Sequence, residues 1–285
     1  MAATVSVPGL IFDAHVHLHD PRLRERVVED PEAVAADVSL LNGTSPRDWA
    51  VVADMKPPPG RRFYRAFGVH PWKADTELEA DWEDRLRQRL TGDADVLAVG
   101  EIGLDRWIEP RDESLQENVF RRQLRLAAEF GLPPVIHCLR AWDALLRILR
   151  EEPLPARGFH VHGFGGSPEV QRQLLEMGAY FSFSAYALAP HRKRMRKAVA
   201  ACPEDRLLLE TDAPDMAPGT ETAAYPLMDT EGNPLHDPRE ILTAYRGVAE
   251  LRGIEEAELR KRVETNFRKL YGKAEACQKA QNPKT

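Results

Sequence analysis

Residues 12–20 read FDAHVHLHD, an apolar segment that carries histidines at alternate positions. In a β-strand successive side chains point to opposite faces, so His15 and His17 share one face with Asp13. Two imidazoles buried side by side are costly unless something binds them. The stretch therefore predicts a strand that ends in a polar site, and the rest of that site must come from other strands.

Seven further apolar runs follow, separated by amphipathic segments. The eight expected strands cover residues 9–15, 36–42, 63–69, 96–102, 133–138, 158–163, 179–184 and 206–211. Segments such as 114–131 have apolar residues at helical spacing and end at a glycine. Eight strands that mostly alternate with helices predict an α/β fold, a closed (β/α)₈ TIM barrel. An open doubly wound sheet is disfavoured because no glycine-rich phosphate turn follows the first strand.

The length and composition fit one domain over residues 1–285. The chain has 285 residues, of which 43% are hydrophobic, and a formal net charge of −6. Such a surface is not suited to holding long nucleic acid by counterion release. Residues 239–253 and 257–272 are expected to form helices outside the barrel, and roughly the last ten residues are expected to be frayed.

The cysteines and the amino terminus indicate the compartment. Cys138, Cys202 and Cys277 are scattered and odd in number, which favours free thiols in a reducing cytosol over a disulfide framework. The segment MAATVSVPGLIF (1–12) has no signal-peptide features, and no segment approaches the length of a transmembrane helix. We therefore expect a cytoplasmic protein with no membrane partner and no obligate protein partner.

Ionisable residues gather at the expected carboxyl ends of the strands, where TIM barrels carry their active sites. They are His15, His17, His70, Glu101, His137, His160, His162, Glu210 and Asp212. Imidazole and carboxylate are the usual ligands of Zn²⁺ and also suit Mn²⁺, Fe²⁺ and Co²⁺. The set is too large for one tetrahedral ion and fits a pair of ions about 3.5–4 Å apart, which activates water for hydrolysis. Glu101 is the expected bridge, because its two oxygens can bind both ions.

Seven short motifs, which together span nearly the whole chain, carry a family resemblance. They are DAHVH (13–17), GVHPW (68–72), GEIGLD (100–105), VIH (135–137), HGFGGS (162–167), ETDAP (210–214) and NFRKLYG (266–272). In their order and spacing the sequence resembles the TatD-type metal-dependent hydrolases of the amidohydrolase superfamily. The resemblance implies a TIM barrel of the metallo-dependent hydrolase type.

The resemblance also implies a metal centre and an activity. It assigns His15, His17 and Asp212 to one ion, His137 and His162 to the other, and Glu101 to both as ligand and catalytic residue. The cofactors would be two divalent ions, Zn²⁺ or Mg²⁺/Mn²⁺. The implied activity is that of a deoxyribonuclease, of the 3'–5' exonuclease type, that removes nucleotides from DNA ends through attack of a metal-bridging hydroxide.

Other polar residues have expected supporting roles. Asp212 lies nearer the loop than Glu210 and is expected to take the proton of the attacking water, while Glu210 could be a base, a water-orienting group or a support for the ligands. Asp13 and His160 lie one layer deeper in the barrel, and we expect them to support the ligands by hydrogen bonds. His19 lies beyond the strand end and is expected to be exposed.

Substrate contacts are expected from His70, Arg140 and Asp105. His70 could contact phosphate or be a structural residue at a strand end. The family resemblance departs at Leu139, where arginine is often found two residues after the histidine. Arg140 could replace it as a phosphate contact, although its side chain would start from the opposite face of the strand.

Two further features remain open at the sequence level. Trp72 and Trp107 follow the third and fourth expected strands and could either stack a base or pack at the rim. The basic run HRKRMRK (191–197) could steer a DNA end or could be the solvated face of a helix.

Three functions compete on these grounds. The leading hypothesis is a phosphodiesterase that acts on DNA ends. A hydrolase of the same superfamily that cleaves a small amide, lactone or phosphate ester would have the same metal site. A metal-holding protein that binds a partner without turnover is disfavoured, because a scaffold does not need a complete ligand set with Glu210 beside it.

Overall fold

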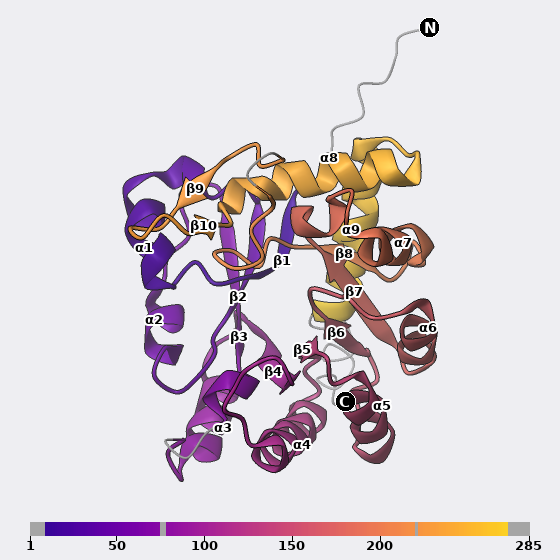
Figure 1. The fold of residues 1–285 in the computed structure, drawn as a ribbon. Helices are drawn as coiled ribbons and strands as arrows, with labels where there is room; N and C mark the ends of the chain where they lie inside the picture. Colours follow the sequence, from indigo (N-terminus) through magenta and orange to yellow (C-terminus); the bar gives the residue numbers. More distant parts are fainter. Residues whose placement is uncertain (1–8, 75–77, 220–221, 273–285) are drawn as a thin grey trace, which may run out of the picture.

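The computed structural model describes residues 9–74, 78–219 and 222–272, in which eight parallel strands form one sheet in chain order. The strands are Phe12–Val16 (β1), Val38–Asn42 (β2), Arg62–Phe67 (β3), Val96–Asp105 (β4), Pro134–Leu139 (β5), Phe159–Val161 (β6), Ala179–Phe183 (β7) and Leu207–Leu209 (β8). Figure 1 shows the strands at the centre, with helices α1 to α8 around them in chain order. The prediction of a (β/α)₈ TIM barrel is confirmed.

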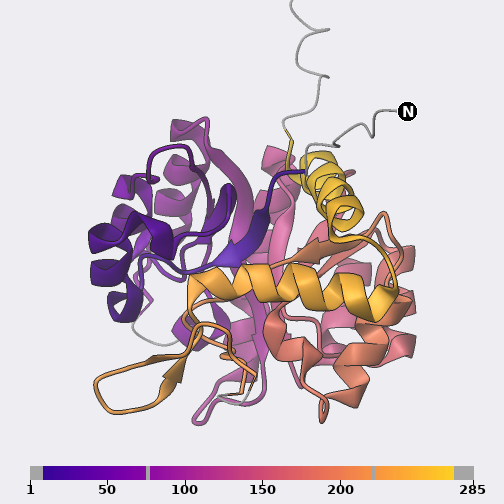
Figure 2. The ribbon, with the colours of Figure 1, turned by 90° about the horizontal axis from the view of Figure 1, so that it is seen from above.

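The outer layer consists of helices that follow the strands. The α-helices are Pro21–Glu29 (α1), Trp49–Asp54 (α2), Trp82–Gly92 (α3), Glu113–Phe130 (α4), Trp142–Glu151 (α5), Pro168–Glu176 (α6), Lys193–Ala201 (α7), Ile241–Arg252 (α8) and Glu256–Tyr271 (α9). Short 3₁₀ turns cover Pro31–Ala33, Pro71–Lys73, Ala185–Leu188 and Pro238–Glu240. The predicted helices over 114–131, 239–253 and 257–272 are thus present, and α9 packs against β8 and β1 (Figure 2).

The ends of helix α4 show why its sequence forms a helix there. The Asp112 side chain accepts a hydrogen bond from the Leu115 N–H at 2.9 Å, which satisfies a backbone donor of the first turn. Gly131 ends the helix with φ 63°, a left-handed conformation that glycine adopts without steric cost.

Backbone hydrogen bonds close the barrel between β1 and the segment that follows β8. The His17 N–H donates to the Ala213 carbonyl at 2.9 Å, and the Asp212 N–H donates to the His15 carbonyl at 2.9 Å. These bonds fix the register between the two segments. As a result the histidines at the end of β1 lie beside Asp212, which is almost 200 residues away in the sequence.

Strand β4 runs three residues beyond its predicted end, and it does so beside the future site. A Cβ at Gly103 would lie 1.9 Å from the His137 carbonyl oxygen, so only glycine lets β4 run this close to β5. Strands β6 and β8 instead end earlier than predicted. Their parallel pairing stops just before His162 and Glu210, where the polar residues begin.

Outside the barrel, a two-stranded hairpin of Leu227–Met228 (β9) and Pro234–Leu235 (β10) projects from the body, in orange in Figure 2. Cys138 and Cys202 are buried free thiols. Cys277 and the predicted frayed end lie outside the described residues. No helix in the described ranges combines the length and hydropathy that a membrane span requires.

Candidate active site

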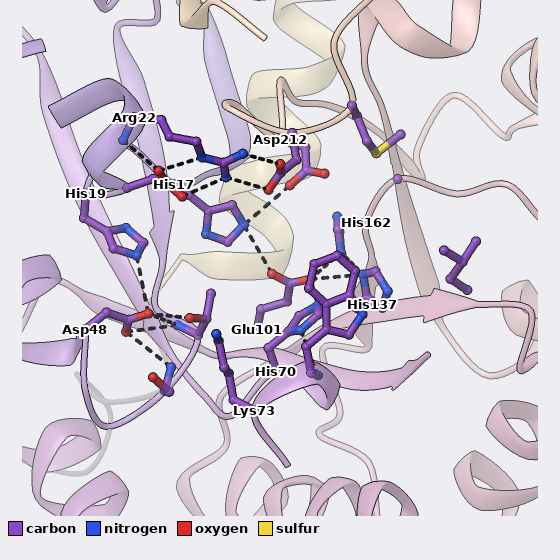
Figure 3. Close-up of a pocket in the computed structure, with 18 of the residues that line it drawn as sticks. His17, His19, Arg22, Asp48, His70, Lys73, Glu101, His137, His162 and Asp212 are labelled. Carbon is purple, nitrogen blue, oxygen red and sulfur yellow. Dashed lines mark hydrogen bonds and ion pairs between the residues drawn. The ribbon is translucent and has the colours of Figure 1, made fainter. Parts of the chain in front are cut away.

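A pocket of about 1570 Å³ opens at the carboxyl ends of the strands. Figure 3 shows side chains from β4, from β5 and from the segments that follow β1, β3, β6 and β8, which point into it from different sides. Of the nine polar residues that the sequence placed at strand ends, six line this pocket: His17, His70, Glu101, His137, His162 and Asp212. At the floor of the pocket they surround Glu101, whose side chain is 3% exposed.

Each oxygen of Glu101 faces a different pair of histidines. Oε2 lies 3.4 Å from His15 Nε2 and 3.2 Å from His17 Nε2. Oε1 lies 3.2 Å from His137 Nδ1 and 2.8 Å from His162 Nε2. The carboxylate thus stands between two separate groups of nitrogen atoms, which is the position a bridging ligand would need.

Asp212 completes the group on the β1 side. Its Oδ1 lies 3.3 Å from His15 Nε2 and 3.5 Å from His17 Nε2, and these two nitrogens are 3.1 Å apart. The backbone of Asp212 has φ 60°, a left-handed conformation that aspartate tolerates better than most residues.

The spacing of these atoms fits a metal ion. Ligands at about 2.0–2.1 Å from one ion lie roughly 2.8–3.4 Å from each other in octahedral or tetrahedral geometry. The separations within the β1 group run from 3.1 to 3.5 Å, and His137 Nδ1 lies 3.3 Å from His162 Nε2 on the other side. Both clusters of histidine and carboxylate could therefore hold a metal ion.

The far nitrogens of two of these histidines are already occupied. His17 Nδ1 donates to the Asn42 carbonyl at 2.8 Å, and His137 Nε2 donates to Asp105 Oδ2 at 2.9 Å. In a neutral imidazole the second nitrogen then has no proton and can bind a cation. His17 Nε2 and His137 Nδ1, which face Glu101, are thus available to bind a metal ion.

His70 differs from the other histidines near Glu101. The Trp72 N–H donates to His70 Nδ1 at 3.1 Å, so neutral His70 carries its proton on Nε2. Burial lowers the pKa of His70, which favours this neutral form. Nε2 lies 3.3 Å from Glu101 Oε1. His70 belongs to a geometric group with Glu101 and His137 that could hold an ion, but its hydrogen bonding makes it a donor and not a ligand.

The structure places Asp105 away from the expected substrate contact. Its side chain is fully buried and accepts hydrogen bonds from His137 Nε2 at 2.9 Å, Trp72 Nε1 at 2.8 Å and the Trp107 N–H at 2.5 Å. Burial raises the pKa of Asp105, but these donors outweigh it and bring the pKa to about 2. These hydrogen bonds occupy both oxygens of Asp105, which disfavours the expected substrate contact, and the one from Nε2 holds the His137 ring.

Asp13 and Glu210 are buried beneath the cluster. Asp13 accepts hydrogen bonds from the Thr211 N–H at 3.0 Å and from the Thr211 hydroxyl at 2.6 Å, and so ties β1 to the end of β8. Glu210 Oε1 accepts from the Gly163 N–H at 2.7 Å. Oε1 of Glu210 also lies 3.9 Å from His162 Nδ1. Asp13 thus holds the backbone beside Asp212, and Glu210 holds the backbone beside His162.

The charges at the floor balance one another. Burial raises the pKa of Glu101, but His70, His162 and the other imidazoles outweigh it and hold the pKa well below its ordinary value. Burial lowers the pKa of His15, but Glu101 and Asp212 outweigh it and raise that pKa to about 9. Without a metal the site thus holds protons, which a divalent cation would displace on binding.

Cationic and aromatic side chains form the rim of the pocket. The Arg140 guanidinium lies 4.0 Å from the centre of the Trp107 ring, and Trp107 is 58% exposed. Trp72 is 45% exposed. On the other side Arg192 lies 3.3 Å above the Tyr186 ring. Arg192, from the basic run, lines the pocket, as do Arg140 and both tryptophans.

The expectation of an exposed His19 is wrong. Its side chain is buried, and Nε2 lies 3.5 Å from Asp48 Oδ2 (Figure 3). Asp48 also accepts a hydrogen bond from the Thr44 N–H at 2.9 Å. Sequence reasoning missed this pair because Asp48 lies just before α2 and not at a strand end. The third histidine of the alternating pattern was the available signal.

A barrel with histidine and carboxylate clusters at the carboxyl ends of its strands is the arrangement of a metal-dependent hydrolase. A family model described as TatD related DNase matches residues 12–272. The uncharacterised metal-dependent hydrolase YabD of Bacillus subtilis is 33% identical over 219 residues, 73% of this chain and 82% of that protein. The chain belongs to the TatD family of metal-dependent hydrolases.

Two other relatives extend the comparison. A protein of Cronobacter sakazakii named 3'-5' ssDNA/RNA exonuclease TatD is 32% identical over 219 residues, 74% of this chain and 78% of that protein. The crystal structure of the TatD homologue YjjV from Escherichia coli K12 matches with a TM-score of 0.80 and 28% identity. That match covers 93% of this chain and 98% of YjjV.

Proposed function

We propose that the protein is a divalent-metal-dependent phosphodiesterase that removes nucleotides from DNA ends. The observation that carries this proposal is the position of Glu101, with one oxygen toward each histidine pair at the floor of a pocket whose rim carries arginines and tryptophans. The relative from Cronobacter sakazakii, named as an exonuclease on single-stranded DNA and RNA, supports the choice of a nucleic acid.

The proposed metal ligands are the residues that surround Glu101. His15, His17 and Asp212 hold one ion, His137 and His162 hold the second, and Glu101 contacts both. When bound, two divalent ions such as Zn²⁺, Mg²⁺ or Mn²⁺ supply an activated water and neutralise the charge that develops on the phosphate.

The remaining residues position the substrate and move protons. Asp212, at the mouth side of the cluster, accepts the proton that the water gives up. His70 carries its proton on Nε2, 3.3 Å from Glu101 Oε1, because Nδ1 is held by the Trp72 N–H, and this N–H would reach a phosphate oxygen bound beside Glu101. Arg140 contributes a cation beside Trp107 at the rim, where a base would stack and its phosphate would lie close to the guanidinium.

The shape of the site favours an end over an internal position. The pocket is lined from β1 round to the segment after β8, and its floor is formed by Glu101 and its histidines. We expect a strand to reach this floor by its terminus. The net charge of −6 for the whole chain argues against a long basic track for DNA.

The decisive experiment is digestion of an end-labelled single-stranded oligonucleotide with Mg²⁺, Mn²⁺, Zn²⁺ or a chelator. A ladder of shortened products is expected, which requires metal and disappears in Glu101→Ala. Glu176→Gln removes an exposed carboxylate on α6 and should digest DNA like the unchanged protein. Intact DNA with every metal would refute the nuclease proposal. Turnover of a small ester or amide by the same protein would then assign the metal site to that substrate class.

A further inference from the structure

A chain of hydrogen bonds runs from the last turn of α9 to the carboxylate beneath the proposed metal site. The Tyr271 hydroxyl lies 2.6 Å from His160 Nδ1, and His160 Nε2 lies 2.5 Å from Ser182 Oγ. Ser182 Oγ in turn bonds Glu210 Oε2. All four side chains are at most 1% exposed. A chain of four buried polar groups has no contact with solvent and must satisfy its own donors and acceptors.

The chemistry of the four groups gives this chain a direction. The Ser182 hydroxyl donates to Glu210 Oε2, so its oxygen is left to accept from His160 Nε2–H. A neutral His160 with its proton on Nε2 accepts at Nδ1, so Tyr271 donates. Burial raises the pKa of Tyr271 well above its usual range, and the phenol therefore keeps the proton that it donates. In the opposite direction the Tyr271 proton would have no acceptor among the described residues.

Glu210 transmits this arrangement to His162. Its Oε1 accepts from the Gly163 N–H at 2.7 Å, directly after the histidine, and lies 3.9 Å from His162 Nδ1. In the described part of the chain His162 Nδ1 makes no hydrogen bond. The opposite nitrogen, Nε2, lies 2.8 Å from Glu101 Oε1. Glu210 thus fixes the backbone that carries His162, while Nε2 of that histidine faces the proposed ion.

We propose that Tyr271, His160 and Ser182 are positioning residues that hold the Glu210 side chain in its orientation under His162. The proposal rests on the metal site of the proposed function and extends it to α9, the helix that ends the described chain. It assigns a role to the tyrosine of NFRKLYG (266–272), a motif that contributes no side chain to the pocket. Groups that support metal ligands from behind typically change metal affinity about 10- to 100-fold when they are removed.

The test is calorimetric titration of metal-free protein with Zn²⁺, which does not depend on any substrate. Tyr271→Phe deletes only the hydroxyl that donates to His160. Ser182→Ala removes the hydroxyl that bonds Glu210. His162→Ala removes a proposed ligand, so the Zn²⁺ binding step that is lost in this variant belongs to the ion on the His162 side of Glu101. Tyr245→Phe is the matched control, because Tyr245 is also fully buried and among the described residues its hydroxyl bonds only the Phe12 backbone.

We expect Tyr271→Phe and Ser182→Ala each to lower the affinity for the Zn²⁺ ion on the His162 side by about tenfold. The affinity for the other ion should stay unchanged. Tyr245→Phe should bind both ions normally, even if its melting temperature falls. Normal zinc binding by both variants, or an equal loss in Tyr245→Phe, would overturn the proposal. If Tyr271→Phe does not fold, Ser182→Ala decides the question. Zinc-binding protein that leaves DNA intact would refute the nuclease assignment and not this inference.

Discussion

Trp107 shows how a single side chain can separate substrate binding from chemistry. It is more than half exposed at the mouth of the pocket, and Arg140 lies over its ring. Stacking of one base on an aromatic ring contributes about 1–3 kcal/mol. Trp107→Ala is therefore expected to raise KM for a single-stranded oligonucleotide about tenfold or more with little change in kcat, and Trp107→Phe to recover most of the loss.

A small phosphodiester without a base, such as bis(4-nitrophenyl) phosphate, provides the control for that variant. Its hydrolysis depends on the metal centre and not on the rim, so Trp107→Ala should turn it over at the normal rate. If KM for the oligonucleotide stays unchanged in Trp107→Ala, the ring only packs at the rim and does not stack a base.

Asp105 is the residue whose role changed most between sequence and structure. Its carboxylate receives the His137 Nε2–H and so selects the tautomer in which Nδ1 faces Glu101. Asp105→Asn keeps the shape but presents an amide, and we expect metal affinity to fall about 10- to 100-fold. Titration of metal-free protein measures this effect. Asp143→Asn, an exposed carboxylate in the first turn of α5, should bind metal normally.

The candidate site could be predicted where a residue's role follows from its position on a strand. His15, His17, His137 and His162 each lie at or just past a strand end, and the alternation of side chains gives their direction. Asp105 and His19 could not be assigned in this way. Their surroundings come from Trp72 and Asp48, which lie in other loops, and only packing brings those loops together.

At the scale of elements, Glu152 connects the carboxyl end of α5 to α4. Its side chain is 5% exposed and accepts from Arg121 at 2.8 Å and from Arg125 at 2.8 and 2.9 Å. Hydrogen bonds from Arg125, followed by Arg121, lower the pKa of Glu152. A carboxylate whose pKa is lowered by folding stabilises the protein at pH values above its unfolded pKa, which is about 4.3 for glutamate. This stabilisation is lost as the pH falls through the pKa of the folded state.

Glu152→Gln is therefore expected to reduce the free energy of unfolding by about 1 kcal/mol near neutral pH. The difference from the unchanged protein should shrink as the pH falls below about 4, because the native carboxyl group is then protonated as well. Urea unfolding at a series of pH values measures both effects. A difference that stays constant down to the lowest pH would show that the variant acts through packing and not through charge.

The order of the elements followed from the sequence, whereas the strand ends did not. Apolar runs separated by amphipathic segments predict eight strands and their helices, and all eight are present. The extent of β4 depends on Gly103, which allows contact with the His137 carbonyl, and no pattern within the strand reveals that approach. Strands β6 and β8 end where the polar residues begin, just before His162 and Glu210.

At the scale of the whole molecule, the barrel gathers acidic side chains and histidines from distant parts of the sequence. Glu101, Asp212 and Glu210 come from β4 and the end of β8 and lie within one buried cluster, with histidines between them. The closing bonds between the His15–His17 segment and Asp212–Ala213 hold two parts of this cluster together. A cation at the site therefore binds the folded barrel and stabilises its seam, whereas the unfolded chain has no such site.

Removal of metal is accordingly expected to destabilise the whole barrel. A ligand present at about 100 times its Kd stabilises a protein by roughly 2.7 kcal/mol per site, and each kcal/mol shifts the melting temperature of a chain this large by about 2–4 °C. Dialysis against a chelator should thus lower Tm by several degrees, and Zn²⁺ or Mn²⁺ should restore it. Glu101→Ala should show a much smaller response to both treatments, because neither histidine pair keeps its shared carboxylate. An unchanged Tm after verified removal of metal would contradict this prediction. The barrel would then form its site without help from the ions, and ion binding would contribute nothing to its stability.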